Sequence, residues 1–115
     1  MSDLNQYQTD AMRTAPGPKD DKQLAVFALG VVGEAGEVAE LIKKHIGHGH
    51  DLDKDKLVNE LGDVLWYVAG LADMVGVSLS EVARRNIDKL KARYPEGFST
   101  EASKARVDTK DGGFW

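Results

Sequence analysis

Apolar residues recur along most of the chain with the period of an α-helix, and no strand-like alternation extends beyond a few residues. The repeat is longest between about Lys22 and Ile46, and it resumes after a loop of glycines and histidines. Short connections between amphipathic helices are typical of helical bundles. The pattern therefore predicts an all-α fold, a four-helix-type bundle. Its helices are expected at residues 4–14, 22–46, about 54–75 and 79–93.

Residues that favour helix starts stand before three of these segments. Asp20 and Asp21 stand at the start of the second helix, where acidic side chains interact favourably with the positive end of the helix dipole. Asp51 or Asp53 is expected to cap the third. The stretch Ser78–Glu81 has the spacing of a capping box for the fourth.

The end of the chain differs in composition from the helical part. Residues 96–115 are rich in Lys, Asp, Ser, Thr and Gly, which predicts an extended or partly disordered segment. Within it, Phe114 and Trp115 are apolar enough to dock on another surface. We therefore expect a helical domain over residues 1–98 and a polar C-terminal tail over residues 99–115.

Charge and composition narrow the classes of function. The chain has no cysteine, which excludes disulfides, thiolate zinc sites and cysteine nucleophiles. Its net charge of −4 and lack of a long basic run argue against binding to polymeric nucleic acid. No stretch has the roughly 18 consecutive apolar residues of a membrane span, and the start lacks the pattern of a signal peptide. These features predict a cytoplasmic protein without membrane contact.

Two pairs of acids occur in matching helical context. Glu34-Ala35-Gly36-Glu37 lies in the second predicted helix, and Glu60-Leu61-Gly62-Asp63 lies in the third. Acids three residues apart share one face of a helix. At about 100° per residue, Glu34 and Glu60 fall in the middle of the apolar stripes of their helices, with Glu37 and Asp63 at the edges. We therefore expect both pairs to face the core.

Four carboxylates in apolar surroundings need a neutralising partner, because unpaired buried charges are costly. Lys44 and Lys56 are near enough in sequence to act as ion-pair partners. A divalent cation is the better explanation, and all-oxygen ligands suit Mg²⁺ or Mn²⁺. Such a site can bind phosphates through the metal and activate water for attack on phosphorus.

Two other polar groups stand out in the sequence. Asn86, Lys89 and Arg93 share one face of the last predicted helix, where two cations would suit a triphosphate. By themselves they would be an ordinary solvated face. The histidines at 45, 48 and 50 lie at a helix end and in a glycine loop, which favours a structural or surface role.

The acidic pattern, with its surrounding stretches, resembles the MazG-like branch of the all-α nucleoside triphosphate pyrophosphohydrolases. The resemblance extends from about Leu24 to Phe98 and includes Gly33–Val38, Glu60–Tyr67 and Asn86–Leu90 followed by Arg93-Tyr94-Pro95. It implies Mg²⁺-dependent cleavage of a (d)NTP to a (d)NMP and pyrophosphate, in nucleotide-pool housecleaning. It also implies a homodimer or homotetramer. Tandem two-domain members are about twice as long, so this chain resembles a single-domain member.

The resemblance also implies roles for particular residues. Glu34, Glu37, Glu60 and Asp63 would hold Mg²⁺, with Mn²⁺ as a possible substitute, and would act in catalysis. The substrate-binding positions would be Lys56, Lys89 and Arg93 on the phosphates, and Tyr67 and Asn86 on the nucleotide. Tyr67 is favoured over Trp66 because it lies within about 20° of Glu60 around the helix, whereas Trp66 lies about 120° away.

Other functions stay open at this level. The acidic motif does not separate general (d)NTP cleavage from hydrolysis of dUTP or of an alarmone such as (p)ppGpp. A di-iron bundle is disfavoured, because no histidine follows Glu34, Glu37 or Glu60 at the third position. A non-enzymatic helical interaction module would not need buried acids.

Overall fold

A computed structural model describes residues 2–15 and 17–105. In these ranges the secondary structure is helical, apart from an isolated bridge between Pro95 and Gly97. The predicted all-α class is confirmed, with bounds close to those expected for the first four helices. The helices are α1 (Ser2–Met12), α2 (Asp21–Gly47), α3 (Lys54–Met74), α4 (Leu79–Arg93) and α5 (Thr100–Ala105).

Aspartates begin the two longest helices. The Asp20 carboxylate accepts a hydrogen bond from the backbone N–H of Gln23 at 2.9 Å. The Asp53 carboxylate likewise accepts from the N–H of Lys56 at 3.0 Å. Each bond satisfies an N–H group that the first helical turn leaves without a partner. Of the two caps considered for α3, the structure therefore selects Asp53.

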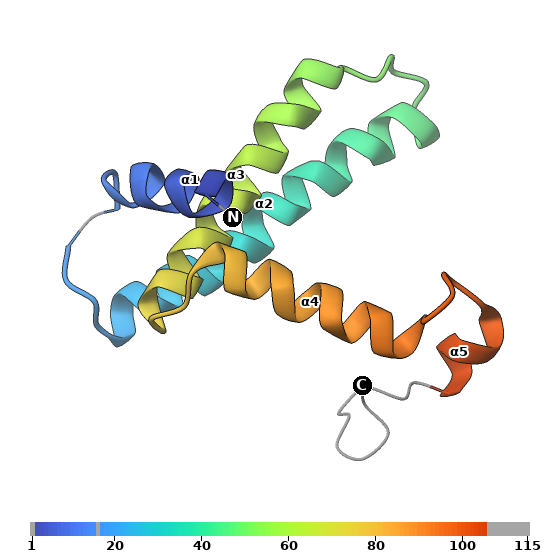
Figure 1. The fold of residues 1–115 in the computed structure, drawn as a ribbon. Helices are drawn as coiled ribbons and strands as arrows, with labels where there is room; N and C mark the ends of the chain where they lie inside the picture. The colour runs from blue at the N-terminus through green and yellow to red at the C-terminus, as the bar shows by residue number, and fades with distance from the viewer. Residues whose placement is uncertain (1, 16, 106–115) are drawn as a thin grey trace. The chain divides into compact units, whose positions relative to one another are not determined.

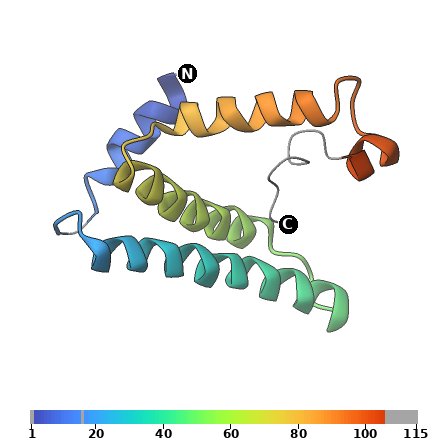
Figure 2. The same cartoon turned by 90° about the horizontal axis from the view of Figure 1, so that it is seen from below.

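Helices α2 and α3 form an antiparallel pair that lies side by side in both views (Figures 1 and 2). Phe27 of α2 is almost fully buried between them and contacts the rings of Trp66 and Tyr67 on α3. The inward face of α2 is the predicted stripe, since its buried or half-buried positions recur at helical spacing. They are residues 23, 27, 30, 31, 34, 38, 41 and 45.

Helix α1 packs against α3 through a buried amide. Gln8 is 8% exposed, and its Nε2 donates to the carbonyls of Ala69 and Val77, both at 3.2 Å. Its Oε1 accepts from the backbone N–H of Leu79 at 3.1 Å. The indole N–H of Trp66 also reaches the end of α1, where it donates to Thr14 Oγ1 at 2.9 Å. These bonds attach α1 to the helix that carries Glu60 and Asp63.

A second compact unit begins at Ser80. On α4, Glu81 binds Arg84 and Arg85 through hydrogen-bonded ion pairs of 2.6–3.1 Å, which lower the pKa of Glu81 to about 2. The prediction of an extended tail is wrong for Thr100–Ala105, which forms α5. The hydroxyl of Ser99 accepts from the N–H of Ala102 and so caps this short helix. The predicted docking residues Phe114 and Trp115 lie outside the described residues.

Within the described ranges, no single helix is long and apolar enough to cross a membrane. The consecutive helices α3 and α4 pass the same test as a bent pair, on length and composition alone.

Candidate metal centre

Three of the four predicted acidic ligands lie together where α2 faces α3. Glu34 of α2 and Glu60 and Asp63 of α3 each offer a carboxylate oxygen, and these oxygens lie within 4.8 Å of one another. Glu34 and Glu60 are half-buried and Asp63 is exposed. Because the three groups come from two helices, the packing of α2 on α3 determines their spacing.

The prediction that both acids of each pair face the core is wrong for the second acid. Glu37 and Asp63 are exposed, whereas Glu34 and Glu60 are half-buried. A step of three residues turns the helix by about 300°, which moves the second acid about 60° to the edge of the apolar stripe. Each helix therefore carries one half-buried and one exposed carboxylate.

The electrostatics of the cluster fit a group that binds a cation. The pKa of Glu34 is raised above its ordinary value of 4.5, first by desolvation and then by the charges of Asp63, Glu60 and Glu37, with a hydrogen bond to Glu60. In the described part of the chain no lysine or arginine forms an ion pair with Glu34, Glu60 or Asp63. Oxygen ligands of this kind suit Mg²⁺ or Mn²⁺. The donor set therefore matches the metal that the sequence suggests.

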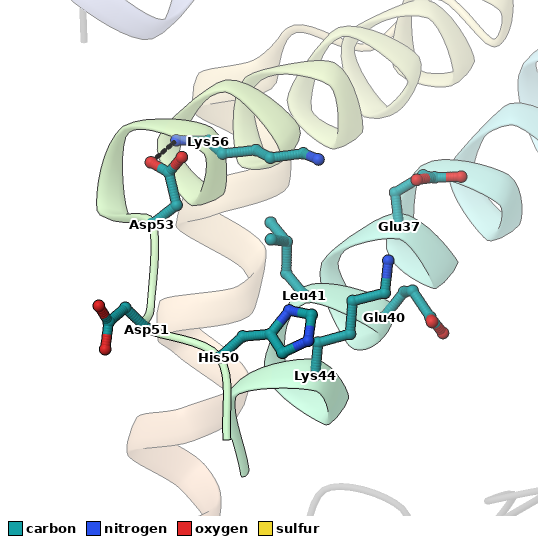
Figure 3. A pocket seen from close by; sticks show the side chains of 8 residues that line it. All are labelled: Glu37, Glu40, Leu41, Lys44, His50, Asp51, Asp53 and Lys56. Carbon is teal, nitrogen blue, oxygen red and sulfur yellow. Dashed lines mark hydrogen bonds between the residues drawn. The ribbon is translucent and has the colours of Figure 1, made fainter. Parts of the chain in front are cut away.

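Glu37, the fourth predicted ligand, lines a neighbouring pocket of about 250 Å³ (Figure 3). The predicted phosphate contact Lys56 lines the same pocket from α3, and its side chain extends toward Glu37. Two further basic residues, Lys44 and His50, contribute to the wall. Since Glu37 lies one turn along α2 from Glu34, this pocket adjoins the carboxylate cluster. The structure thus brings Lys56 and Glu37 to one pocket, and the phosphate contact of Lys56 stays a prediction.

Tyr67, the predicted nucleoside contact, packs between the two long helices. Its ring lies against the backbone of Gly30 on α2 and makes edge contacts with Phe27 and Trp66. The indole N–H of Trp66 is hydrogen-bonded to Thr14 and Ala11 at the end of α1. The rings of Tyr67 and Trp66 therefore have packing roles that the sequence pattern did not indicate. The nucleoside contact of Tyr67 stays a prediction.

The remaining predicted contacts lie on α4, in the second unit. Asn86, Lys89 and Arg93 follow one another at the spacing of a single helix face. Asn86 and Lys89 are exposed and Arg93 is half-buried, with its guanidinium 5.9 Å from the centre of the Tyr94 ring. Their roles in binding nucleotide and phosphate stay predictions.

The histidines near the end of α2 form a helix-end structure. Nδ1 of His45 lies 2.7 Å from the carbonyl of His50, and the N–H of His48 donates to the carbonyl of Lys44. No histidine of the described ranges belongs to the carboxylate cluster. This agrees with the expected structural role and disfavours a di-iron centre.

One residue near the site was not identified from the sequence as a site residue. The pKa of Tyr7 on α1 is raised, first by desolvation and then by the charge of Asp63. Its hydroxyl therefore lies within the electrostatic field of the cluster. In the sequence Tyr7 is one of several apolar positions of a short helix, so no local pattern distinguishes it.

The fold and the cluster define an all-α protein whose two longest helices bring together three carboxylates with the chemistry of a cation site. The chain belongs to the MazG nucleotide pyrophosphohydrolase family, whose domain matches residues 23–98. This match covers the carboxylate cluster and all the predicted substrate contacts.

Two relatives were found among curated proteins. The gene 37 protein of Mycobacterium phage L5 is 42% identical over 100 residues, which cover 79% of this chain and 88% of the relative. The uncharacterized protein YvdC of Bacillus subtilis (strain 168) is 37% identical over 70 residues, 53% of this chain and 66% of the relative. No solved structure gives a significant match.

Proposed function

We propose that the protein is a Mg²⁺-dependent nucleoside triphosphate pyrophosphohydrolase that converts a (d)NTP to a (d)NMP and pyrophosphate. The observation that carries the proposal is the cluster of Glu34, Glu60 and Asp63, whose carboxylate oxygens lie within 4.8 Å of one another. Membership of the MazG family supports the type of reaction. Housecleaning of the nucleotide pool in the cytoplasm is the role we propose for this activity.

The acidic and basic residues of the site would have different roles. Glu34, Glu60 and Asp63 would hold the metal, with Glu37 completing the set from the adjoining pocket. When bound, Mg²⁺ would neutralise phosphate charge and lower the pKa of a coordinated water. Lys56 would bind a phosphate oxygen at the edge of the pocket. One of these carboxylates would also orient the attacking water as a hydrogen-bond acceptor, through an oxygen that does not bind the metal.

For Lys89, Arg93 and Asn86 of α4 we propose contacts with the substrate. The two cations would bind the triphosphate, for which arginine is suited by its paired N–H donors. Asn86 and Tyr67 would contact the nucleoside. Hydrolysis of dUTP or (p)ppGpp would use the same phosphate-binding groups, so a substrate panel has to include both.

We further propose that the protein is a homodimer or homotetramer. Several large apolar side chains along α2 and α3 are more than half exposed in the single chain, among them Leu29 at 72% and Val32 at 70%. Ile46 at the end of α2 and Val58 near the start of α3 are similarly exposed, at 76% and 64%. Apolar surface of this extent is typical of surfaces that another subunit covers.

The test is pyrophosphate release from a panel of NTPs, dNTPs, dUTP and (p)ppGpp, with and without EDTA. We expect turnover with Mg²⁺, its loss in EDTA, and a fall in kcat of at least about a hundredfold in Asp63→Asn. The control is Asp55→Asn, which removes the same charge from the exposed first turn of the same helix. Full turnover in EDTA, or equal activity of the two variants, would contradict the proposal.

A further inference from the structure

Two aromatic rings are packed against glycines where α2 meets α3. A Cβ atom added to Gly30 would lie 2.6 Å from Cζ of Tyr67 and still closer to two other ring atoms. A Cβ added to Gly70 would lie 2.8 Å from Cζ of Phe27, and again closer to two other ring atoms. Each helix therefore supplies one glycine and one aromatic ring, which lets the two backbones approach closely.

These contacts are in register with the carboxylate cluster. Along α2 the order is Phe27, Gly30 and Glu34, and along the antiparallel α3 the facing residues are Gly70, Tyr67 and Asp63. The Gly30–Tyr67 contact is one helical turn, about 6 Å, from the Glu34–Asp63 pair. The Phe27–Gly70 contact is two turns away, about 10 Å.

The Tyr67 ring has little freedom to move away from an added methyl group. The ring of Trp66 lies against it with centroids 5.0 Å apart, and the ring of Phe27 lies 6.2 Å away. Carbon atoms in contact are normally about 3.5–4.0 Å apart, so a Cβ at Gly30 requires a displacement of more than about 1 Å. That exceeds the roughly 0.5 Å within which a site must hold its ligands.

We infer that the Gly30–Tyr67 contact sets the spacing of Glu34 from Glu60 and Asp63, and so determines the affinity for the metal. Gly30 and Tyr67 are thus positioning residues for the carboxylates, whether or not Tyr67 also contacts the nucleoside. Mg²⁺ and Mn²⁺ need oxygen ligands in near-octahedral geometry at short distances, so a change of helix spacing weakens binding. This inference rests on the proposed function, because it concerns the same metal.

The experiment is a titration of the full chain with Mn²⁺, followed by the EPR signal of the free ion, without nucleotide. We expect Gly30→Ala to weaken Mn²⁺ binding about tenfold or more. Gly70→Ala is the matched control, because it makes the same kind of clash with Phe27 farther from the cluster. We expect Gly70→Ala to lower the melting temperature as much as Gly30→Ala does. Its affinity for Mn²⁺ should change less than about threefold, since distant sites couple weakly. Gly47→Ala, with no atom near its added Cβ, should leave affinity unchanged.

A second pair of variants keeps the inference testable if Gly30→Ala does not fold. Truncation of the ring in Tyr67→Leu leaves space for a methyl group at position 30. We expect Gly30→Ala/Tyr67→Leu to fold and to bind Mn²⁺ within about twofold of Tyr67→Leu alone, because the clash is gone. A tenfold loss on adding the methyl group without the ring would overturn the inference.

The remaining outcomes separate the inference from the proposed function. If Gly30→Ala binds Mn²⁺ with wild-type affinity, the inference is overturned. Equal losses of Mn²⁺ affinity in Gly30→Ala and Gly70→Ala would also overturn it, because they would indicate a general effect of helix packing. If the wild-type chain binds no Mn²⁺, the proposed metal site itself fails, whatever the variants do.

Discussion

Replacement of Gln8 by alanine should destabilise the helical unit far more than its place on a polar helix suggests. The side chain makes three buried or part-buried hydrogen bonds, of 3.2, 3.2 and 3.1 Å, to Ala69, Val77 and Leu79. A hydrogen bond contributes about 1 kcal/mol net to stability, and a buried group left without its partner costs about 1–3 kcal/mol. We therefore expect Gln8→Ala to lower the free energy of unfolding by about 3 kcal/mol.

The assay is urea unfolding of wild type and variant at one protein concentration, since association would make stability depend on concentration. The expected loss corresponds to a fall of roughly 10 °C or more in melting temperature. Gln6→Ala is the control, because Gln6 is exposed on the same helix and binds only the neighbouring Asp10. Equal stabilities of the two variants would refute the reasoning.

Replacement of Gln8 by glutamate tests which of its hydrogen bonds are donated and which are accepted. In Gln8→Glu the ionised carboxylate still accepts from the N–H of Leu79 but faces two carbonyl oxygens without a proton to donate. Protonation restores one donor, so the folded state raises the pKa of this glutamate. We expect the stability gap between wild type and Gln8→Glu to narrow as pH falls through that raised pKa. A gap that does not depend on pH would contradict this account.

Four further predictions concern the acidic cluster, the Tyr67 ring and the exposed apolar residues of α2. Because the folded state raises the pKa of Glu34 above 4.5, protons should compete with Mn²⁺ at a higher pH than for an ordinary glutamate, as a titration at several pH values would show. The contribution of Glu34 to the stability of the metal-free protein should rise as pH falls through this raised pKa, and urea unfolding would detect it. Tyr67→Phe keeps the ring on Gly30, so its melting temperature should stay near that of wild type; a raised KM at unchanged kcat would then identify a hydroxyl contact with substrate. Light scattering should give a mass above that of one chain, and Leu29→Glu should reduce it if α2 forms the interface.

Much of the site was predictable from the sequence because it depends on helical period. The inward face of α2, with Phe27, Glu34 and Leu41 on one line, follows from the rotation per residue. The same arithmetic places Glu60 on the inward face of α3. Asp20 and Asp53 cap their helices because a short acidic side chain reaches the free N–H groups of the first turn. All of these are properties of single helices, which local sequence determines.

Other features exist only where separate helices meet. The sequence presents Tyr67 as one aromatic residue near an acidic motif, and only the packing of α3 on α2 places its ring against Gly30. From the sequence alone, Gln8 is expected to be an ordinary surface residue of a polar helix. Its hydrogen-bond partners in the structure lie more than sixty positions away. Tyr7 comes under the influence of Asp63 for the same reason.

The sequence by itself determined which acids are candidates for the chemistry, since it puts two pairs of acids at helical spacing on two helices. The tertiary structure decided how those acids are divided: Glu34, Glu60 and Asp63 gather, while Glu37 turns toward the pocket shared with Lys56. The physical reason is that the period of a helix gives directions around one axis, whereas distances between carboxylates depend on how closely two helices pack. Near the cluster that approach depends on Gly30, a residue without a side chain, whose importance appears only once the ring of Tyr67 is in place.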